Sequence, residues 1–191
     1  MILIRTNGGK DIGLGHVMRC YSLAEAIKRT FPNEEIIFRV NREMVGLLQE
    51  KGYRTETFET FNDKDIDTIK NKKPNLVIFD SYLGTNEYLK KLRQIAPLIQ
   101  FDDNNNIYNP INANILINGN IHAPQLNYSK EFKETKLLLG LQYLIMRPEY
   151  WQVNPNQTGK GVLLTTGGSD FKQLMPRFIK ALANTEDDKT I

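Results

Sequence analysis

The chain has 191 residues, of which 40% are hydrophobic and 25% charged, and its formal net charge is +3. These values are typical of a folded globular chain and argue against a disordered, membrane-spanning or nucleic-acid-binding protein. The single cysteine, Cys20, excludes an internal disulfide, and the apolar start after Met1 is too short for a secretion signal. We therefore expect a cytoplasmic protein that has neither a membrane nor a nucleic acid as its partner.

Short apolar runs rich in branched residues alternate along the chain with segments of helical periodicity. The sequence predicts strands at 2–4, 36–40, 76–79, 98–101, 115–117 and 137–139. It predicts helices at about 16–29, 43–51, 63–72, 85–95 and 143–151. Strands that alternate with helices form parallel sheets covered on both faces. The expected class is therefore a doubly wound α/β fold.

A change in composition follows this first domain, which we place at residues 1–151. Residues 152–160 are polar with a proline and a glycine, as in a linker. After them the sequence predicts a strand at 162–166, a tight turn at 167–170 and a helix at 171–182. One such unit cannot bury its own faces. We therefore expect residues 161–191 to begin a second domain that continues beyond Ile191 and completes the protein.

A glycine-rich loop between Gly8 and Gly15 follows the first strand and leads to His16 at the start of a helix. In parallel sheets ligands bind beyond the carboxyl ends of strands, and glycines let a ligand approach the backbone. The pattern therefore favours His16 as a site residue; the alternative is a turn with no function. A dinucleotide fingerprint fits less well, because Met18 stands at its third glycine and Asn41 follows the second strand.

Polar residues also follow the strands at 76–79 and 98–101. With those that follow the first strand, they should meet at one edge of the sheet. This predicted cluster comprises Arg5, Asn7, His16, Asp80, Tyr82 and Asp103. Each aspartate alone could also be a helix cap or turn residue. A metal held by Asp80, Asp102 and Asp103 is a further alternative, but the chain offers no nearby histidine pair, so we expect no metal.

A second candidate site is the turn formed by Gly167, Gly168, Ser169 and Asp170. The turn precedes a predicted helix, and the free N–H groups and dipole at a helix N-terminus attract phosphate. The alternative is an ordinary helix cap at Ser169 or Asp170.

Several segments together resemble a known family, the UDP-2,4-diacetamido-2,4,6-trideoxy-altropyranose hydrolases of the pseudaminic acid pathway and the related spore-coat polysaccharide biosynthesis proteins. The matching segments occur in the family's order and span nearly the whole chain. They are Ile12-Gly-Leu-Gly-His-Val-Met-Arg-Cys20 with Leu23-Ala24, Phe79-Asp-Ser-Tyr82, Phe101-Asp-Asp103, Leu139-Gly140 with Met146-Arg-Pro-Glu149, and Thr166-Gly-Gly-Ser-Asp170.

The resemblance implies the N-terminal half of a two-domain, glycosyltransferase-B type fold, with a site in the cleft between two Rossmann-like halves. It implies that His16 and Tyr82 are catalytic and that the turn at 167–170 binds a diphosphate. One departure is Asn7, where the family usually has aspartate. The expected substrate-binding residues are Arg5, Asn7, Gly13, Gly15, Asp80, Asp103, Gly167, Gly168, Ser169 and Asp170.

The implied reaction is hydrolysis of a UDP-sugar, with His16 as the base for water and UDP as the leaving group. The helix end beside His16 disfavours a charged ring, and the reaction needs no cofactor. Two alternatives remain at this stage. A glycosyltransferase would pass the sugar to an acceptor in place of water, and a binding module would hold the nucleotide sugar without turnover.

Overall fold

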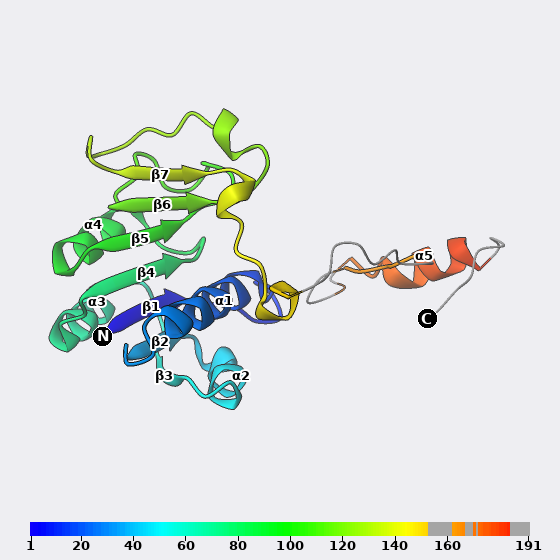
Figure 1. Cartoon of the computed structure of the whole chain (residues 1–191), viewed down its shortest axis with the longest axis horizontal. Coiled ribbons are helices and arrows are strands. Elements are labelled where there is room, and N and C mark those ends of the chain that lie inside the picture. The colour runs from blue at the N-terminus through cyan, green and yellow to red at the C-terminus, as the bar shows by residue number, and fades with distance from the viewer. Residues whose placement is uncertain (153–161, 167–169, 171, 184–191) are drawn as a thin grey trace.

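The computed structural model describes residues 1–152, 162–166, 170 and 172–183. Its central element is a seven-stranded sheet with the order β3-β2-β1-β4-β5-β6-β7. The strands all run in the same direction (Figure 1). They are β1 Ile2–Thr6, β2 Ile36–Val40, β3 Arg54–Thr57, β4 Leu76–Asp80, β5 Leu98–Phe101, β6 Ile115–Asn118 and β7 Lys136–Leu139. The predicted doubly wound, Rossmann-like α/β class is confirmed.

Helices cover both faces of the sheet. The α-helices are α1 Gly15–Thr30, α2 Val45–Glu50, α3 Asp63–Lys72, α4 Asn86–Ile95 and α5 Met175–Leu182. Short 3₁₀ helices are η1 Arg42–Met44, η2 Ala123–Gln125, η3 Leu141–Tyr143 and η4 Pro148–Tyr150. Among the described residues, no helix is both long and apolar enough to cross a membrane.

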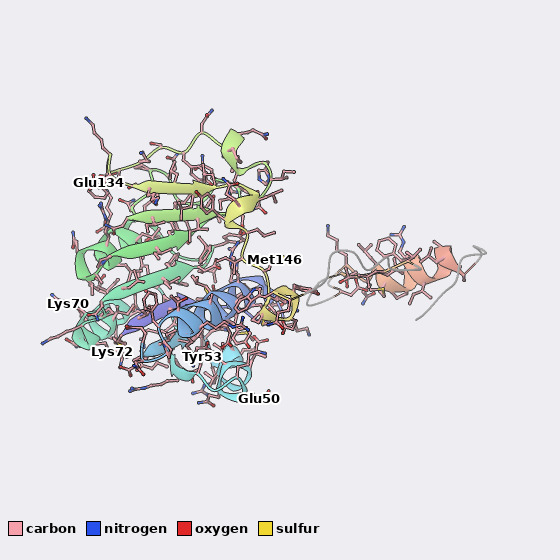
Figure 2. All side chains as sticks on the ribbon, viewed as in Figure 1. Glu50, Tyr53, Lys70, Lys72, Glu134 and Met146 are labelled. Atoms are coloured by element: carbon pink, nitrogen blue, oxygen red, sulfur yellow. The ribbon has the colours of Figure 1, made fainter. Side chains whose placement is uncertain are left out.

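The hydrophobic core has one part on each face of the sheet. On one face, Leu3 and Phe79 pack with residues of α3 and α4, such as Ile69 and Leu92. On the other face, Ile4 and Ile78 pack with α1 and α2, together with Val17, Cys20 and Leu48. Tyr53, labelled in Figure 2, belongs to this second part and donates a hydrogen bond to Glu25 of α1. Alternate residues of a strand thus face different helices, which decides where its polar side chains point.

Local signals in the sequence set the ends of two helices. Asn62 caps α3 by accepting a hydrogen bond from the Asp65 N–H, and Thr85 caps α4 in the same way through Tyr88. At the other end of α3, Lys73 adopts a left-handed conformation with φ of 49°. Both helices begin and end within one residue of their predicted bounds.

Two predicted elements are wrong, and a third begins later than predicted. The helix predicted at 143–151 is replaced by irregular chain and 3₁₀ turns, because Pro148 disfavours helical geometry at Arg147, which is extended. Residues 162–166 form no strand. The helix predicted from 171 begins only at Met175, and none of its residues is buried. The predicted linker at 152–160 lies, apart from residue 152, outside the described residues.

One strand was missed. β3 has the sequence Arg-Thr-Glu-Thr and lies at the edge of the sheet, where its residues are partly or fully exposed. An edge strand with solvent on its faces needs no apolar run, so it leaves no hydrophobic signal.

Candidate functional site

The order of the strands reverses between β1 and β4. From β1 the chain first builds outward to β2 and β3, then returns to add β4 on the other side of β1. Open α/β sheets bind ligands at such a switch point, beyond the carboxyl ends of the strands. The loop after β1 and the residues after β4 lie at this position.

The loop after β1 is held in a fixed shape. Gly9 and Gly13 form two backbone hydrogen bonds with each other, and Gly13 has φ of 85°, a conformation that favours glycine. Asn41 bonds both the N–H and the carbonyl of Gly8. A side chain added at Gly9 would meet the Glu43 carboxylate, whereas Gly13 and Gly15 have open space beside them. The loop thus delivers the chain into α1 with an open surface at Gly13 and Gly15.

His16 lies in the first turn of α1 and bonds to the last residue of β4. Its Nδ1 is 2.7 Å from Oδ1 of Asp80, and the two residues are 7% and 1% exposed. An ionised carboxylate can only accept a hydrogen bond, so Nδ1 carries the proton. In the neutral ring, Nε2 then has a free lone pair. Histidine held in this way by a carboxylate is the arrangement of a general base.

Arg19, one turn after His16 on α1, joins two carboxylates. Its Nε and Nη2 each donate to Asp80 at 2.8 Å, and its Nη1 donates to Asp103 at 2.7 Å. Burial alone would raise the pKa of Asp80, but the bonds from Arg19 and His16 lower it below the usual value. The pKa of Asp103 is lowered in the same way by Arg19 and Tyr82. Both groups are therefore carboxylates at neutral pH.

Tyr82 completes the cluster from the loop after β4. Its hydroxyl donates a hydrogen bond to Asp103, and its ring meets that of His16 edge-on, with centroids 4.4 Å apart. Burial and the bond to Asp103 raise the pKa of Tyr82, so the hydroxyl keeps its proton. The side chain is 42% exposed, which leaves part of it open to a ligand.

Two asparagines support Asp103 from the end of β6. Asn120 donates to the Asp103 side chain at 3.2 Å, and Asn118 donates to its backbone carbonyl at 3.1 Å. Asn118 also bonds to Tyr128, whose hydroxyl donates to Asp102. This arrangement fixes the loop after β5 and commits Asp102 to a structural contact.

The structure thus brings together four of the six residues expected at the sheet edge: His16, Asp80, Tyr82 and Asp103. Sequence reasoning did not assign roles to Arg19, Asn118 or Asn120. A signal existed for Arg19, since residues three apart on a helix share a face and Arg19 follows His16 by three. The asparagines follow a predicted strand, but nothing in the sequence marks them as partners of Asp103.

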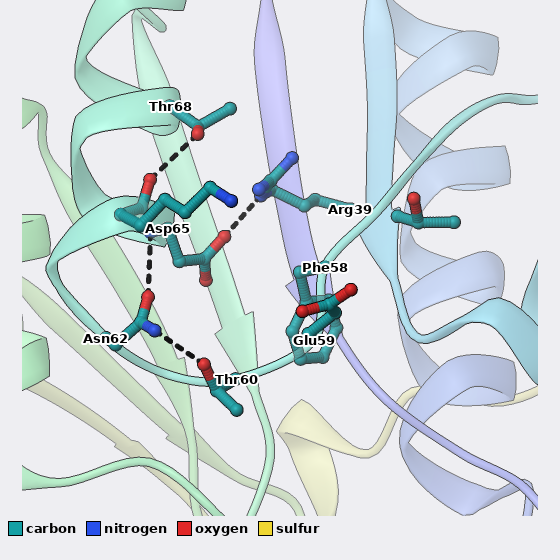
Figure 3. Close-up of a pocket in the computed structure, with 9 residues that line it drawn as sticks. Arg39, Phe58, Glu59, Thr60, Asn62, Asp65 and Thr68 are labelled. Carbon is teal, nitrogen blue, oxygen red and sulfur yellow. Dashed lines mark hydrogen bonds and ion pairs between the residues drawn. The ribbon is translucent and has the colours of Figure 1, made fainter.

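Arg5 is not part of this cluster. It points to the α3 face of the sheet, where its Nε donates to Asp65 at 2.8 Å and its guanidinium lies over the Phe58 ring. Arg39, its neighbour in register on β2, donates to the same carboxylate at 2.5 Å. Figure 3 draws this bond. The cavity drawn there has a volume of about 180 Å³ and is lined by Arg39 and Asp65. It lies on the opposite face of the sheet from His16.

The other expected residues have varied surroundings. Asn7 is 2% exposed, and its Oδ1 is buried without a hydrogen-bond partner. The carboxylate of Asp170 accepts hydrogen bonds from the N–H groups of Leu174 and Met175 at the start of α5. Asp170 thus bonds N–H groups at the start of the helix, while the N-cap position itself is Leu174. Gly167, Gly168 and Ser169 lie outside the described residues.

The described part of the chain contains no group of three or more His, Cys, Asp or Glu residues arranged to hold a metal. Asp80, Asp102 and Asp103, the set considered from the sequence, instead bond to Arg19, Tyr82 and Tyr128. In this structure the three carboxylates therefore have protein partners.

The fold and site define a Rossmann-like α/β protein with a buried histidine–carboxylate pair at its strand-order switch point. No family model matches the chain. It is 30% identical over 200 residues to the uncharacterized protein MJ1062 of Methanocaldococcus jannaschii, covering 100% of this chain and 41% of that protein.

Two further similar proteins have descriptive names. One is the spore coat polysaccharide biosynthesis protein SpsG of Bacillus subtilis, 27% identical over 97% of this chain and 56% of SpsG. The other is the UDP-2,4-diacetamido-2,4,6-trideoxy-beta-L-altropyranose hydrolase of Campylobacter jejuni, 27% identical over 97% of this chain and 66% of that enzyme. The chain thus spans 41% to 66% of the length of these relatives. Their names support the family indicated by the sequence motifs.

Proposed function

We propose that the complete protein hydrolyses a UDP-linked diacetamido-trideoxy sugar in the cytoplasm, in nonulosonic acid or surface polysaccharide biosynthesis. The names of two relatives, a polysaccharide biosynthesis protein and a UDP-sugar hydrolase, support this assignment. The observation that carries it is the bond between His16 and Asp80, which leaves Nε2 of a buried histidine free to accept a proton.

In the proposed reaction, the oxygen of a water molecule bonds to the anomeric carbon while the bond from that carbon to the diphosphate breaks. UDP leaves with the electron pair, through a transition state with positive charge on the sugar. His16 Nε2 takes the proton of the attacking water, and Asp80 stabilises the resulting imidazolium. Asp80 is 1% exposed and bonded to His16 and Arg19, so we assign it a positioning role in place of substrate contact.

The diphosphate needs hydrogen-bond donors and positive potential. The first turn of α1 has backbone N–H groups without intrahelical partners, and no side chain caps them. We propose that these groups and residues 167–170, which the sequence predicts to form a turn, bind the diphosphate, with Gly13 and Gly15 allowing close approach. Tyr82 and Asp103 are candidates for sugar contacts, and a second domain would bind the uridine.

The test is to incubate the complete protein with UDP-2,4-diacetamido-2,4,6-trideoxy-beta-L-altropyranose and to measure UDP and free sugar without an acceptor. UDP-N-acetylglucosamine serves as a second substrate. Release of equal amounts of UDP and free sugar supports the hydrolase. Turnover that requires an added acceptor indicates a glycosyltransferase, and binding without turnover indicates a binding module. Either of these two results overturns the proposal.

A further inference from the structure

His16 and Tyr82, two of the side chains in this cluster that can reach a ligand, each donate their only polar proton to an aspartate. His16 directs its Nδ1–H at Asp80, and Tyr82 directs its hydroxyl proton at Asp103. What each presents to the open side is a lone pair, on Nε2 of His16 and on the hydroxyl oxygen of Tyr82. The two rings are in edge-on contact, so these acceptors belong to one site.

This polarity depends on both aspartates being carboxylates. A protonated Asp103 could donate to the Tyr82 oxygen and turn the hydroxyl proton outward. A protonated Asp80 could donate to Nδ1 and move the ring proton to Nε2, which removes the base. The protonation states of the two carboxylates therefore decide whether His16 and Tyr82 offer the ligand an acceptor or a donor.

One cation bonds to both carboxylates. Arg19 makes two bonds to Asp80 at 2.8 Å and two to Asp103, at 2.7 and 3.2 Å. Its planar fork is suited to two carboxylates at once, which a lysine ammonium on a flexible stem is not. Its side chain is 22% exposed and lies over the Phe101 ring, so the bonds are partly shielded from water.

We infer that Arg19 is a positioning residue that sets the hydrogen-bond polarity of the site, so that His16 and Tyr82 present two acceptors and the ligand group meeting Tyr82 is a donor. This inference rests on the proposed function and adds to it a requirement on the substrate. A sugar hydroxyl or the N–H of an acetamido group meets that requirement. An ether or carbonyl oxygen at the same place does not, because two acceptors would face each other.

The inference predicts a shift in pH dependence when Arg19 loses its charge. Removal of a cation raises the pKa of a neighbouring carboxyl group, so Asp80 and Asp103 take up protons at higher pH. The acidic limb of the rate should therefore move to higher pH. The titratable or charged groups that face the two carboxylates are His16, Arg19, Cys20, Tyr82, Tyr108 and Tyr128.

The experiment compares Arg19→Gln and Arg19→Lys with wild type in the complete protein, with Arg54→Gln as the control. Arg54 makes an ion pair with Glu35, and both side chains are exposed. Its replacement therefore leaves no buried charge without a partner. Nitrogen-15 NMR of the His16 ring reports its tautomer without any need for turnover. We expect the Nδ1–H form in wild type and in Arg54→Gln, and a mixture with the Nε2–H form in Arg19→Gln.

The same variants are then assayed for UDP release. We expect kcat to fall by about 10²-fold in Arg19→Gln, the scale of a misplaced catalytic group, with little change in KM. Arg19→Lys should recover part of kcat and of the pH profile. Unchanged tautomer, kcat and acidic limb in a folded Arg19→Gln protein overturn the inference. Absence of turnover in wild type, with the tautomer shift present, overturns only the proposed reaction.

If Arg19→Gln does not fold, Asp103→Asn tests the same polarity, because it leaves His16, Asp80 and Arg19 intact. Its amide can donate to the Tyr82 oxygen. We expect Asp103→Asn to lower kcat/KM for a diacetamido substrate more than for an analogue that lacks the N–H donors. The ratio of the two kcat/KM values should therefore be smaller than in wild type. An unchanged ratio contradicts the inference.

Discussion

The substitution Asp80→Asn separates the charge of this side chain from its shape. In the wild-type site the two carboxylate oxygens accept bonds from His16 Nδ1 at 2.7 Å and from Arg19 Nε and Nη2 at 2.8 Å, and the Cys20 thiol donates a longer one at 3.8 Å. Asparagine offers one oxygen and one NH2 group. Whichever way the amide is turned, a donor faces either His16 or Arg19, and one buried donor loses its partner.

The loss of folding free energy in Asp80→Asn depends on how deeply the ion pair is buried. Neutralising one partner of a buried ion pair costs about 3–5 kcal/mol, and Arg19 keeps its second carboxylate, so we expect the lower end, about 3 kcal/mol. For a chain of this size that lowers the melting temperature by roughly 6–12 °C. The wrong histidine tautomer should reduce kcat by about 10³–10⁴-fold.

Thermal unfolding followed by circular dichroism measures the first effect, and UDP release from the folded fraction measures the second. Asp67→Asn on α3 is the control, because that residue is exposed. A melting temperature within about 2 °C of wild type would refute the assignment of a buried, energetically coupled pair. Normal kcat in a folded Asp80→Asn protein would refute the role of the carboxylate in holding the His16 tautomer.

Three other predictions concern the same site. His16→Asn should lower turnover by roughly two to four orders of magnitude without loss of UDP binding, whereas His122→Asn should be nearly silent; equal kinetics of the two variants would remove His16 from the mechanism. Tyr82→Phe should lower kcat/KM with the melting temperature almost unchanged, because the ring still meets His16; a lower melting temperature with unchanged kcat/KM would mean a structural tyrosine. Asp80 and Asp103 should make the free energy of unfolding depend on pH below their reference pKa of 3.8, because their pKa values are lowered in the native state. The stabilisation that these two carboxylates contribute is complete above pH 3.8 and is lost as the pH falls further. A free energy of unfolding that stays constant through this acid range, measured with urea, would contradict the ion pairs.

Much of the fold could be predicted because each buried strand appears in the sequence as a short apolar run. Each of the six predicted strands within residues 1–151 is short and apolar, and each exists. The pattern failed where burial does not decide the conformation. Arg54–Thr57 is a polar edge strand, and the segment around Pro148 has a helical spacing of apolar residues that the proline prevents from forming a helix.

The site was predictable at the level of strand ends but not of side-chain direction. The motif after β1, the acid at the end of β4 and the acid after β5 predicted that His16, Asp80 and Asp103 would meet. Arg5, two residues before Asn7, was expected with them and lies on the other face, because it shares the direction of Leu3 toward α3 and α4. Period-two alternation gives relative faces within a strand, and the sequence did not show which face carried the site.

The geometry of the cluster depends on the contact between one helix and one strand. His16 and Arg19 lie one turn apart on α1, so their relative position is fixed by the helix, and both bond to Asp80 at the end of β4. Val17 and Cys20 on the same helix are fully buried in the core beside Ile78 of β4. Packing of α1 on the sheet therefore sets the distances of the polar site. A larger side chain at Val17 would move His16 and Arg19 together away from Asp80, so it should impair the site even though Val17 makes no polar contact.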